Sequence, residues 1–216
     1  MKQKSYKGVA MEGWVARWYD KIRGTPKEQP TLVHKIKAAI PQGARLLEIA
    51  PGPGHLARAL AKNGYYRVEG LDISHTFVEM AGTLSIHKGI PVDFHQGDVA
   101  DMPFEEESFD GIVCVAAFKN FSQPVKALQE MRRVLKKGGR IWILDLRKEV
   151  TEEDLQYHLQ EEMQLRGLHL LFTRLIFKHF LLKNAYTRQE MKELTVLAGW
   201  ARVDFEEDAL SLYTMY

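Results

Sequence analysis

From residue 45 onward the chain alternates between short β-forming runs and segments of helical periodicity, and this alternation strongly constrains the fold. Strands that alternate with helices in this way pair in parallel and are covered by helices on both faces. Residues 112–115 and 141–144 are continuous apolar runs, as expected for strands buried on both faces. We therefore expect strands at residues 45–50, 66–71, 92–96, 109–115 and 140–146, with helices at 56–63, 74–87 and 124–137 between them.

The segments on either side of this core are mainly helical in pattern. Helical periodicity is present at residues 9–21 and 31–40, and a long helical block follows the fifth strand. A shorter helix and two β-like runs end the sequence. Because the pattern contains no second-domain boundary, we expect a single domain over residues 1–216, with an N-terminal helical cap at 1–42 and a helical lid or insert at 151–186.

Composition excludes several classes of protein. Cys114 is the single cysteine, which rules out an internal disulfide and disfavours a thiolate metal site. The 30 Lys and Arg balance the 28 Asp and Glu, so charge does not indicate a nucleic-acid partner. The N-terminus has no secretory pattern, and residues 168–182, the most apolar stretch, are too short to span a bilayer. We expect a cytoplasmic protein without an integral membrane segment.

A glycine-containing turn follows the first expected strand. Gly52 and Gly54 precede a helix, and glycine lets ligand atoms approach the backbone without a Cβ in the way. The helix N-terminus adds unpaired N–H groups and a partial positive charge, a combination that suits a carboxylate, a phosphate or a nucleotide. The same residues also fit the G-x-G-x-x-G/A fingerprint of dinucleotide-binding proteins.

Acidic residues at the strand ends help to separate these interpretations. Glu48 stands four residues before Gly52, where a carboxylate opposes a pyrophosphate and favours a cationic ligand. Asp72 closes the second strand, 18 residues after Gly54, and can accept hydrogen bonds from ribose hydroxyls in either kind of site. Asp98 follows the third strand and can accept from an adenine amino group, with Val99 beside it as a wall for the ring.

Taken together, these motifs resemble class I S-adenosylmethionine-dependent methyltransferases, in particular the small-molecule branch typified by quinone-biosynthesis enzymes. The resemblance covers about residues 45 to 146 and rests on residues 48–54, Asp72, Gly97-Asp98 through Phe109-Asp110, and 133–139. It implies an α/β, Rossmann-like sheet of seven mostly parallel strands with helices on both faces and an antiparallel last strand. The terminal residues 198–200, followed by two β-like runs, fit the strand pair that closes such a sheet.

The resemblance also implies S-adenosylmethionine as the cofactor and S-adenosylhomocysteine as the product. Glu48 would face the amino group of the methionine part, Asp72 the ribose, and Asp98 and Val99 the adenine. Ile73 would pack on the adenine ring, and Tyr19 would cap the cofactor from the N-terminal helix. The full set of expected cofactor-binding residues is Tyr19, Glu48, Ala50, Gly52, Gly54, Asp72, Ile73, Asp98, Val99 and Ala116.

The chain departs from the family pattern at two places. Ala50 replaces a common glycine, and prolines at 51 and 53 stiffen the turn without removing either glycine. After the fourth strand, where many relatives carry histidine or asparagine, this chain reads Ala116-Ala117-Phe118-Lys119-Asn120. That region usually faces the transferred methyl group, so it bears on the identity of the acceptor. Residues 168–182 are rich in Leu and Phe, and a lid of that composition suits a small apolar or aromatic acceptor.

The sequence assigns neither a general base nor a metal site. No histidine pair has a metal-ligand spacing beside a carboxylate, and Asp145 lacks evident companion ligands. Two other functions remain open: a nucleotide-dependent oxidoreductase of Rossmann type, and a non-enzymatic scaffold that keeps the methyltransferase fold. The expected partner is a small-molecule methyl acceptor and not nucleic acid, and the apolar stretch is compatible with a homodimer.

Overall fold

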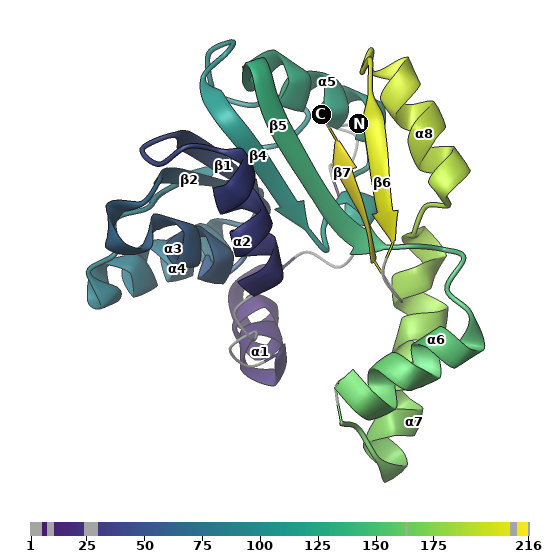
Figure 1. Ribbon diagram of the computed structural model, residues 1–216. Helices are drawn as coiled ribbons and strands as arrows, with labels where there is room; N and C mark the ends of the chain where they lie inside the picture. Colours follow the sequence, from purple (N-terminus) through teal and green to yellow (C-terminus); the bar gives the residue numbers. More distant parts are fainter. Residues whose placement is uncertain (1–5, 8–10, 24–29, 163, 208–210, 216) are drawn as a thin grey trace, which may run out of the picture.

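A computed structural model describes residues 6–7, 11–23, 30–162, 164–207 and 211–215. In this part of the chain one sheet runs through the molecule in the order β3-β2-β1-β4-β5-β7-β6 (Figure 1). Its first five strands are parallel, as the alternation of strands and helices predicts, and the order reverses between β1 and β4. These strands are β1 (Arg45–Ile49), β2 (Arg67–Asp72), β3 (Asp93–Gln96), β4 (Phe109–Val115) and β5 (Leu135–Leu146).

Of the remaining two strands, β7 runs opposite to the parallel strands, and β6 beyond it runs in their direction again. β7 (Ser211–Met215) pairs antiparallel with β5 and with β6 (Val203–Glu207), and a register shift interrupts both pairings. The chain between β5 and β6 is helical, and Figure 1 shows α6 and α7 projecting from one end of the sheet, below α8. This part comprises α6 (Glu152–Tyr157), a π-helical segment (His158–Glu162), α7 (Gly167–Ile176), further short turns, and α8 (Arg188–Leu197).

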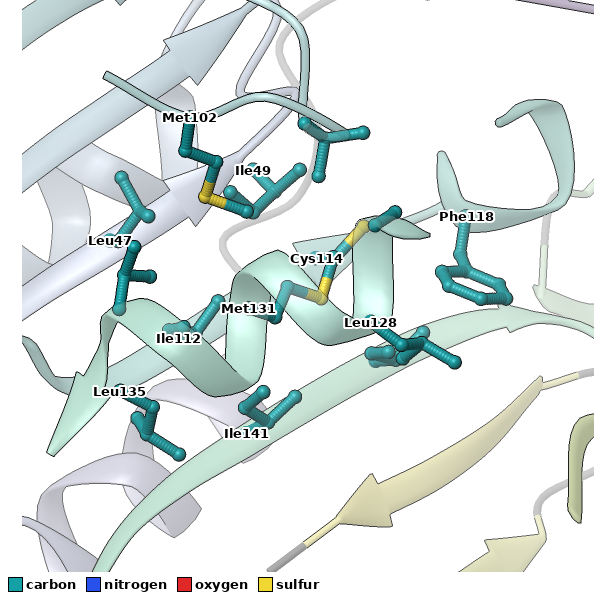
Figure 2. Packing of buried hydrophobic residues seen from close by; sticks show 14 of the residues in the cluster. Leu47, Ile49, Met102, Ile112, Cys114, Phe118, Leu128, Met131, Leu135 and Ile141 are labelled. Carbon is teal, nitrogen blue, oxygen red and sulfur yellow. The ribbon is translucent and has the colours of Figure 1, made fainter. Parts of the chain in front are cut away.

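Two apolar clusters confirm an α/β fold with helices on both faces of the sheet. One cluster joins the sheet to α5 (Pro124–Val134) and α8, and Figure 2 shows Leu128 and Met131 over Ile112, Cys114 and Ile141. The other joins it to α2 (Pro30–Ala39) and α3 (His55–Ala61). Each buried Leu, Ile or Met side chain contributes about 1.5–3 kcal/mol, so the two clusters stabilise the sheet from both sides.

The predicted boundary between the helix at residues 124–137 and the strand at 140–146 is wrong. The helix expected at residues 124–137 ends at Val134, and Leu135 already pairs with Phe109 in the sheet. Leu135 is only 8% exposed, so the apolar core takes it into the strand. The chain then bulges and turns at Gly138, where φ is +78°, before parallel pairing resumes at Arg140.

The strand order creates one crevice at an edge of the sheet. In an open parallel sheet, the crevice at the reversal of strand order lies beyond the carboxyl ends of the strands and is the usual ligand site. Here it lies beyond β1 and β4, beside α3, α4 (His75–Lys88) and the N-terminal helix α1 (Gly13–Arg23). The helices in the described part of the chain are all too short or too polar to cross a lipid bilayer.

Candidate functional site

A cavity of about 540 Å³ occupies this crevice. Its walls come from the turn after β1, the ends of β2 and β4, the segment after β3, and the N-terminal residues. Nine of the ten residues that the sequence assigns to cofactor binding line it: Tyr19, Glu48, Ala50, Gly52, Asp72, Ile73, Asp98, Val99 and Ala116. The tertiary structure thus gathers side chains from five separate parts of the sequence around one space.

Gly54 is the expected cofactor-binding residue that does not line the cavity. Its φ is +73°, and a Cβ at this position would stand 2.6 Å from Cζ of Phe94. Glycine is therefore required here for close packing against the Phe94 ring, and the direct approach of Gly54 to a ligand stays a prediction. Gly52 also has a positive φ, +54°, but a Cβ there would meet nothing within 4 Å.

Asp72 connects the glycine turn to α4. The residue is 5% exposed, and its carboxylate accepts hydrogen bonds from the backbone N–H of Gly52 at 3.0 Å and of Ser74 at 2.9 Å. Burial raises the pKa of Asp72, and these two hydrogen bonds oppose part of that rise. Ser74, not Asp72, is the N-cap residue of α4. The Asp72 side chain is therefore held rigidly at the cavity wall and has lone pairs left to accept hydrogen bonds from a ligand.

Glu48 brings a second carboxylate to the cavity, at the end of β1. Glu48 is 5% exposed and lies close enough to Arg58 of α3 to affect the pKa of that guanidinium. Burial lowers the pKa of Arg58, and the carboxylates of Glu48 and Asp20 act in the opposite direction. The Arg58 guanidinium donates a hydrogen bond to the carbonyl of Pro53 at 2.7 Å and so ties the glycine turn to α3.

The segment after β3 forms another wall. Val99 is buried, whereas Ile73, which follows β2, is 41% exposed although it is a large apolar side chain. Asp98 accepts a hydrogen bond from the backbone N–H of Ala100 at 2.9 Å, which fixes the turn that carries it. An exposed isoleucine, a buried valine and an acid in the lining of one cavity suit a flat, partly polar ring.

Residues of the N-terminal segment form a further wall of the cavity. Tyr19 of α1 lines it and packs edge-on against Phe77, with ring centroids 6.4 Å apart. Tyr6 also lines it and pairs as an isolated antiparallel bridge with Phe121, beyond β4. Burial raises the pKa of Tyr6 to about 12, and the nearby Tyr19 and acidic groups add to the rise. The Tyr6 hydroxyl therefore stays neutral at physiological pH and can donate a hydrogen bond.

The turn after β4 supplies the wall opposite the glycine turn. Ala116 has a left-handed backbone with φ +57°, and its N–H donates to the carbonyl of Leu144 at 2.6 Å. Asn120 and Phe121 follow it along the cavity. By contrast, no described residue of the segment 151–186 lines the cavity.

Sequence reasoning missed several residues of the site. Tyr6, Met11, Glu12 and Asp20 line the cavity, and Arg58 supports the glycine turn. The position of Arg58, four residues after Gly54 on a helix, was a usable signal because side chains at this spacing return to the same face. Apart from Tyr19, which the family resemblance places over the cofactor, the N-terminal residues gave no comparable signal, since their place depends on how the chain crosses the sheet.

Comparisons with known proteins agree with this geometry. A family model described as a methyltransferase domain matches residues 47–143. The demethylmenaquinone methyltransferase of Clavibacter sepedonicus is 34% identical over 140 residues, which are 63% of this chain and 56% of that protein. The demethylmenaquinone methyltransferase of Thermotoga maritima is 38% identical over 103 residues, 47% of this chain and 43% of that protein. The chain spans about half the length of these curated relatives.

A solved structure extends the similarity to the whole fold. The crystal structure of a SAM-dependent methyltransferase from Aquifex aeolicus superposes with a TM-score of 0.68 and covers 93% of this chain and 96% of that one. Sequence identity in this comparison is 20%, so the similarity concerns the fold.

Proposed function

We propose that this protein, in which a family model described as a methyltransferase domain matches residues 47–143, transfers the methyl group of S-adenosylmethionine to a small, apolar or aromatic acceptor. The co-product is S-adenosylhomocysteine. The proposal also includes the chemical class of the acceptor. It is suggested by the demethylmenaquinone methyltransferases among the relatives and by the apolar character of residues 168–182.

The observation that carries the proposal is the pair of buried carboxylates, Glu48 and Asp72, that line one cavity together with the glycine turn. A sulfonium ligand with an amino group and a ribose matches this arrangement, because the carboxylates attract the cation and accept from the hydroxyls. A dinucleotide would place its pyrophosphate beside Glu48, where the like charges repel. The cavity therefore favours methyl transfer over the oxidoreductase alternative.

Within the cavity we assign each residue a role from its position. Asp72 accepts from the ribose hydroxyls, and Glu48 faces the amino group of the methionine part. Asp98, Val99 and Ile73 form the adenine slot. The remaining contacts come from the backbone of the two turns and from the aromatic cap, namely Ala50, Gly52, Ala116 and Tyr19.

The chemistry needs little more than positioning. S-adenosylmethionine supplies a methyl group that its sulfonium already makes electrophilic, and the acceptor atom displaces the sulfur in line. Holding the two reactants in line contributes about 7–11 kcal/mol to lowering the barrier. The protein's part is to orient both molecules between the glycine turn and the Ala116 turn and to exclude water. A general base is needed only for an acceptor that must lose a proton to become nucleophilic.

We further propose that residues 1–216 act as one domain. The N-terminal segment 1–42 serves as a cap over the cofactor, because Tyr6 and Tyr19 line the cavity. The segment 151–186 serves as a lid for the acceptor. Since its described residues lie outside the cavity wall, this role requires α6 and α7 to move toward the cavity when the acceptor binds.

Thermal unfolding with added ligands tests the proposal. S-adenosylhomocysteine at one hundred times its dissociation constant should stabilise the folded state by about 2.7 kcal/mol. For a domain near this size the unfolding temperature should then rise by roughly 5–10 °C. NADPH, used as the control ligand, should leave it unchanged. A rise with NADPH alone would favour the oxidoreductase, and no rise with either ligand would favour the scaffold.

A further inference from the structure

The turn that precedes α1 is tied to the N-terminus of α4 by a cluster of polar contacts. The Glu12 carboxylate accepts hydrogen bonds from the backbone N–H of His75 at 2.9 Å and of Thr76 at 3.1 Å. It also accepts from the Thr76 hydroxyl at 2.7 Å. The hydroxyl oxygen of Thr76 in turn accepts from the backbone N–H of Gly13 at 2.8 Å. Glu12 therefore supplies, from 63 residues away, the anionic cap that the first turn of α4 lacks.

The same contacts lead directly to the cofactor wall. Ser74, the N-cap residue of α4, donates its hydroxyl to the carbonyl of Met11, and its backbone N–H donates to Asp72. Asp72 then accepts from Gly52 in the glycine turn. A continuous chain of hydrogen bonds thus runs from the N-terminal segment, through the residue assigned to the ribose, to the turn after β1.

Apolar packing alone holds α1 weakly. Among the described side chains of α1, Ala16 is fully buried, whereas Trp14 is 76% exposed and Trp18 is 54% exposed. Tyr19 contacts Phe77 edge-on, and Asp20 reaches His55 at 3.8 Å. The contacts of Glu12 therefore make up a large part of what keeps α1 over the cavity.

From this arrangement we propose that Glu12 is a positioning residue for the cofactor: by capping α4 it holds α1 closed, with Tyr19 and Asp20 against the cavity, and so slows cofactor release. The inference rests on the proposed function, because the cavity is taken to hold the adenosyl cofactor. Hydrogen bonds from Thr76 and His75 outweigh the effect of burial and lower the pKa of Glu12, so the carboxylate stays charged near neutral pH.

The test uses S-adenosylhomocysteine as the probe and needs no acceptor. Its association and dissociation rates are followed by stopped-flow fluorescence of the tryptophans on α1, and its affinity by calorimetry. Glu12→Ala should raise the dissociation constant and the dissociation rate together, by about fivefold to tenfold, the ordinary weight of a helix cap. The association rate should change by less than about twofold, and the unfolding temperature of the ligand-free protein should fall by no more than about 2–4 °C, the shift that a loss of about 1 kcal/mol gives in a domain of this size.

Three further variants and one control make the result specific. Glu12→Gln keeps an acceptor oxygen without the charge and should fall between wild type and Glu12→Ala. Thr76→Val should weaken binding in the same direction, and the double variant should be little worse than Glu12→Ala, because both residues act in one contact. Glu79→Ala is the matched control, since this exposed acid also lies on α4 and pairs with the exposed His75, at 3.6 Å.

The outcomes separate this inference from the proposed function. If wild-type protein does not bind S-adenosylhomocysteine, the proposed function fails and the role of Glu12 fails with it. If wild type binds but Glu12→Ala matches Glu79→Ala in affinity and dissociation rate, the proposed function stands and the positioning role is wrong. A lower unfolding temperature with unchanged ligand kinetics would also overturn it, because Glu12 would then be only structural.

Discussion

The Lys119 ammonium and the Asp145 carboxylate form an ion pair of 2.6 Å in which both side chains are only 4% exposed. Lys119 also donates to the carbonyl of Ala116 at 2.8 Å, and Asp145 accepts from the backbone N–H of Lys119 at 2.9 Å. The pair thus fastens the turn after β4 to the end of β5. It holds the left-handed Ala116 against the cavity.

Breaking this pair should be costly. In Lys119→Met, a buried carboxylate loses its counter-ion, and we expect a loss of about 3–5 kcal/mol in the free energy of unfolding, measured by urea denaturation. The double variant Lys119→Met/Asp145→Asn removes both charges and should recover at least half of that loss. Lys137→Met, at a side chain that is 91% exposed, is the control and should stay within about 0.5 kcal/mol of wild type. A Lys119→Met protein as stable as the control would show that the pair does not stabilise the turn.

Asp72 is expected to decide cofactor affinity. Asp72→Ala removes the acceptor for the ribose hydroxyls and should weaken S-adenosylhomocysteine binding about 100-fold or more, as the loss of two hydrogen bonds to a charged group implies. Calorimetry measures the effect, and circular dichroism should show an unchanged fold. Asp93→Ala, on β3, is the matched control, and near-wild-type affinity of Asp72→Ala would refute the ribose assignment. Because burial raises the pKa of Asp72, wild-type affinity should begin to fall at a higher pH than an ordinary aspartate would give.

The two glycines of the turn should differ in their effect on the stability of the ligand-free protein. Gly52→Ala places a Cβ in open space and carries only the strain of a positive φ, roughly 1–2 kcal/mol. Gly54→Ala carries the same strain and also places its Cβ 2.6 Å from the Phe94 ring, which adds about 1–3 kcal/mol. Urea denaturation of both variants measures the difference. Equal losses would mean that the Phe94 ring moves aside freely.

Glu130 should contribute to stability in a pH-dependent way. Hydrogen bonds from Arg133, and one from the backbone N–H of Met102, lower the pKa of Glu130 below its ordinary 4.5. A carboxylate with a lowered folded-state pKa stabilises the protein above about pH 4.5, and this contribution is lost as the pH falls through the folded-state value.

Glu130→Gln should therefore be less stable than wild type by about 1.5–3 kcal/mol at pH 7, the usual worth of a hydrogen bond to a charged group. The difference should narrow as the pH falls below about 4.5, where the unfolded carboxyl becomes protonated. Urea denaturation at several pH values measures it, with the exposed Glu105→Gln as control. A difference that is the same at pH 7 and pH 4 would exclude a contribution from the charge.

The apolar side of α7 should tolerate polar substitution. Leu168, Leu171 and Phe172 are 83%, 58% and 67% exposed, so changing all three to Gln should alter the free energy of unfolding by less than about 1 kcal/mol. S-adenosylhomocysteine affinity should not change, whereas a lid role predicts slower turnover of the proposed apolar or aromatic acceptor. Leu155→Gln in α6, at a side chain that is 1% exposed, is the contrasting variant and should cost about 2–5 kcal/mol. A triple variant as unstable as Leu155→Gln would identify α7 as core.

Much of the candidate site could be predicted because its chemistry lies at strand ends. Glu48, Asp72 and Asp98 each follow or close a β-forming run, and the carboxyl ends of parallel strands meet at one edge of a sheet. The glycine turn is similarly local, since the need for a positive φ at Gly52 and Gly54 shows in the residue type itself. The end of α5, expected at residue 137, was predicted wrongly because burial of Leu135, a tertiary effect, outweighed the local helical pattern.

The sequence by itself determined the parallel core, the glycine turn and the acids around it, because each depends on residue types within a few positions of one another. Only the tertiary structure decided which distant groups meet: Glu12 with Thr76, Tyr6 with Phe121, and Lys119 with Asp145. It also decided that Gly54 faces Phe94 and that the apolar side of α7 lies exposed. Such pairings depend on where the chain crosses the sheet and on which charges become buried together, and neither is encoded in any short segment.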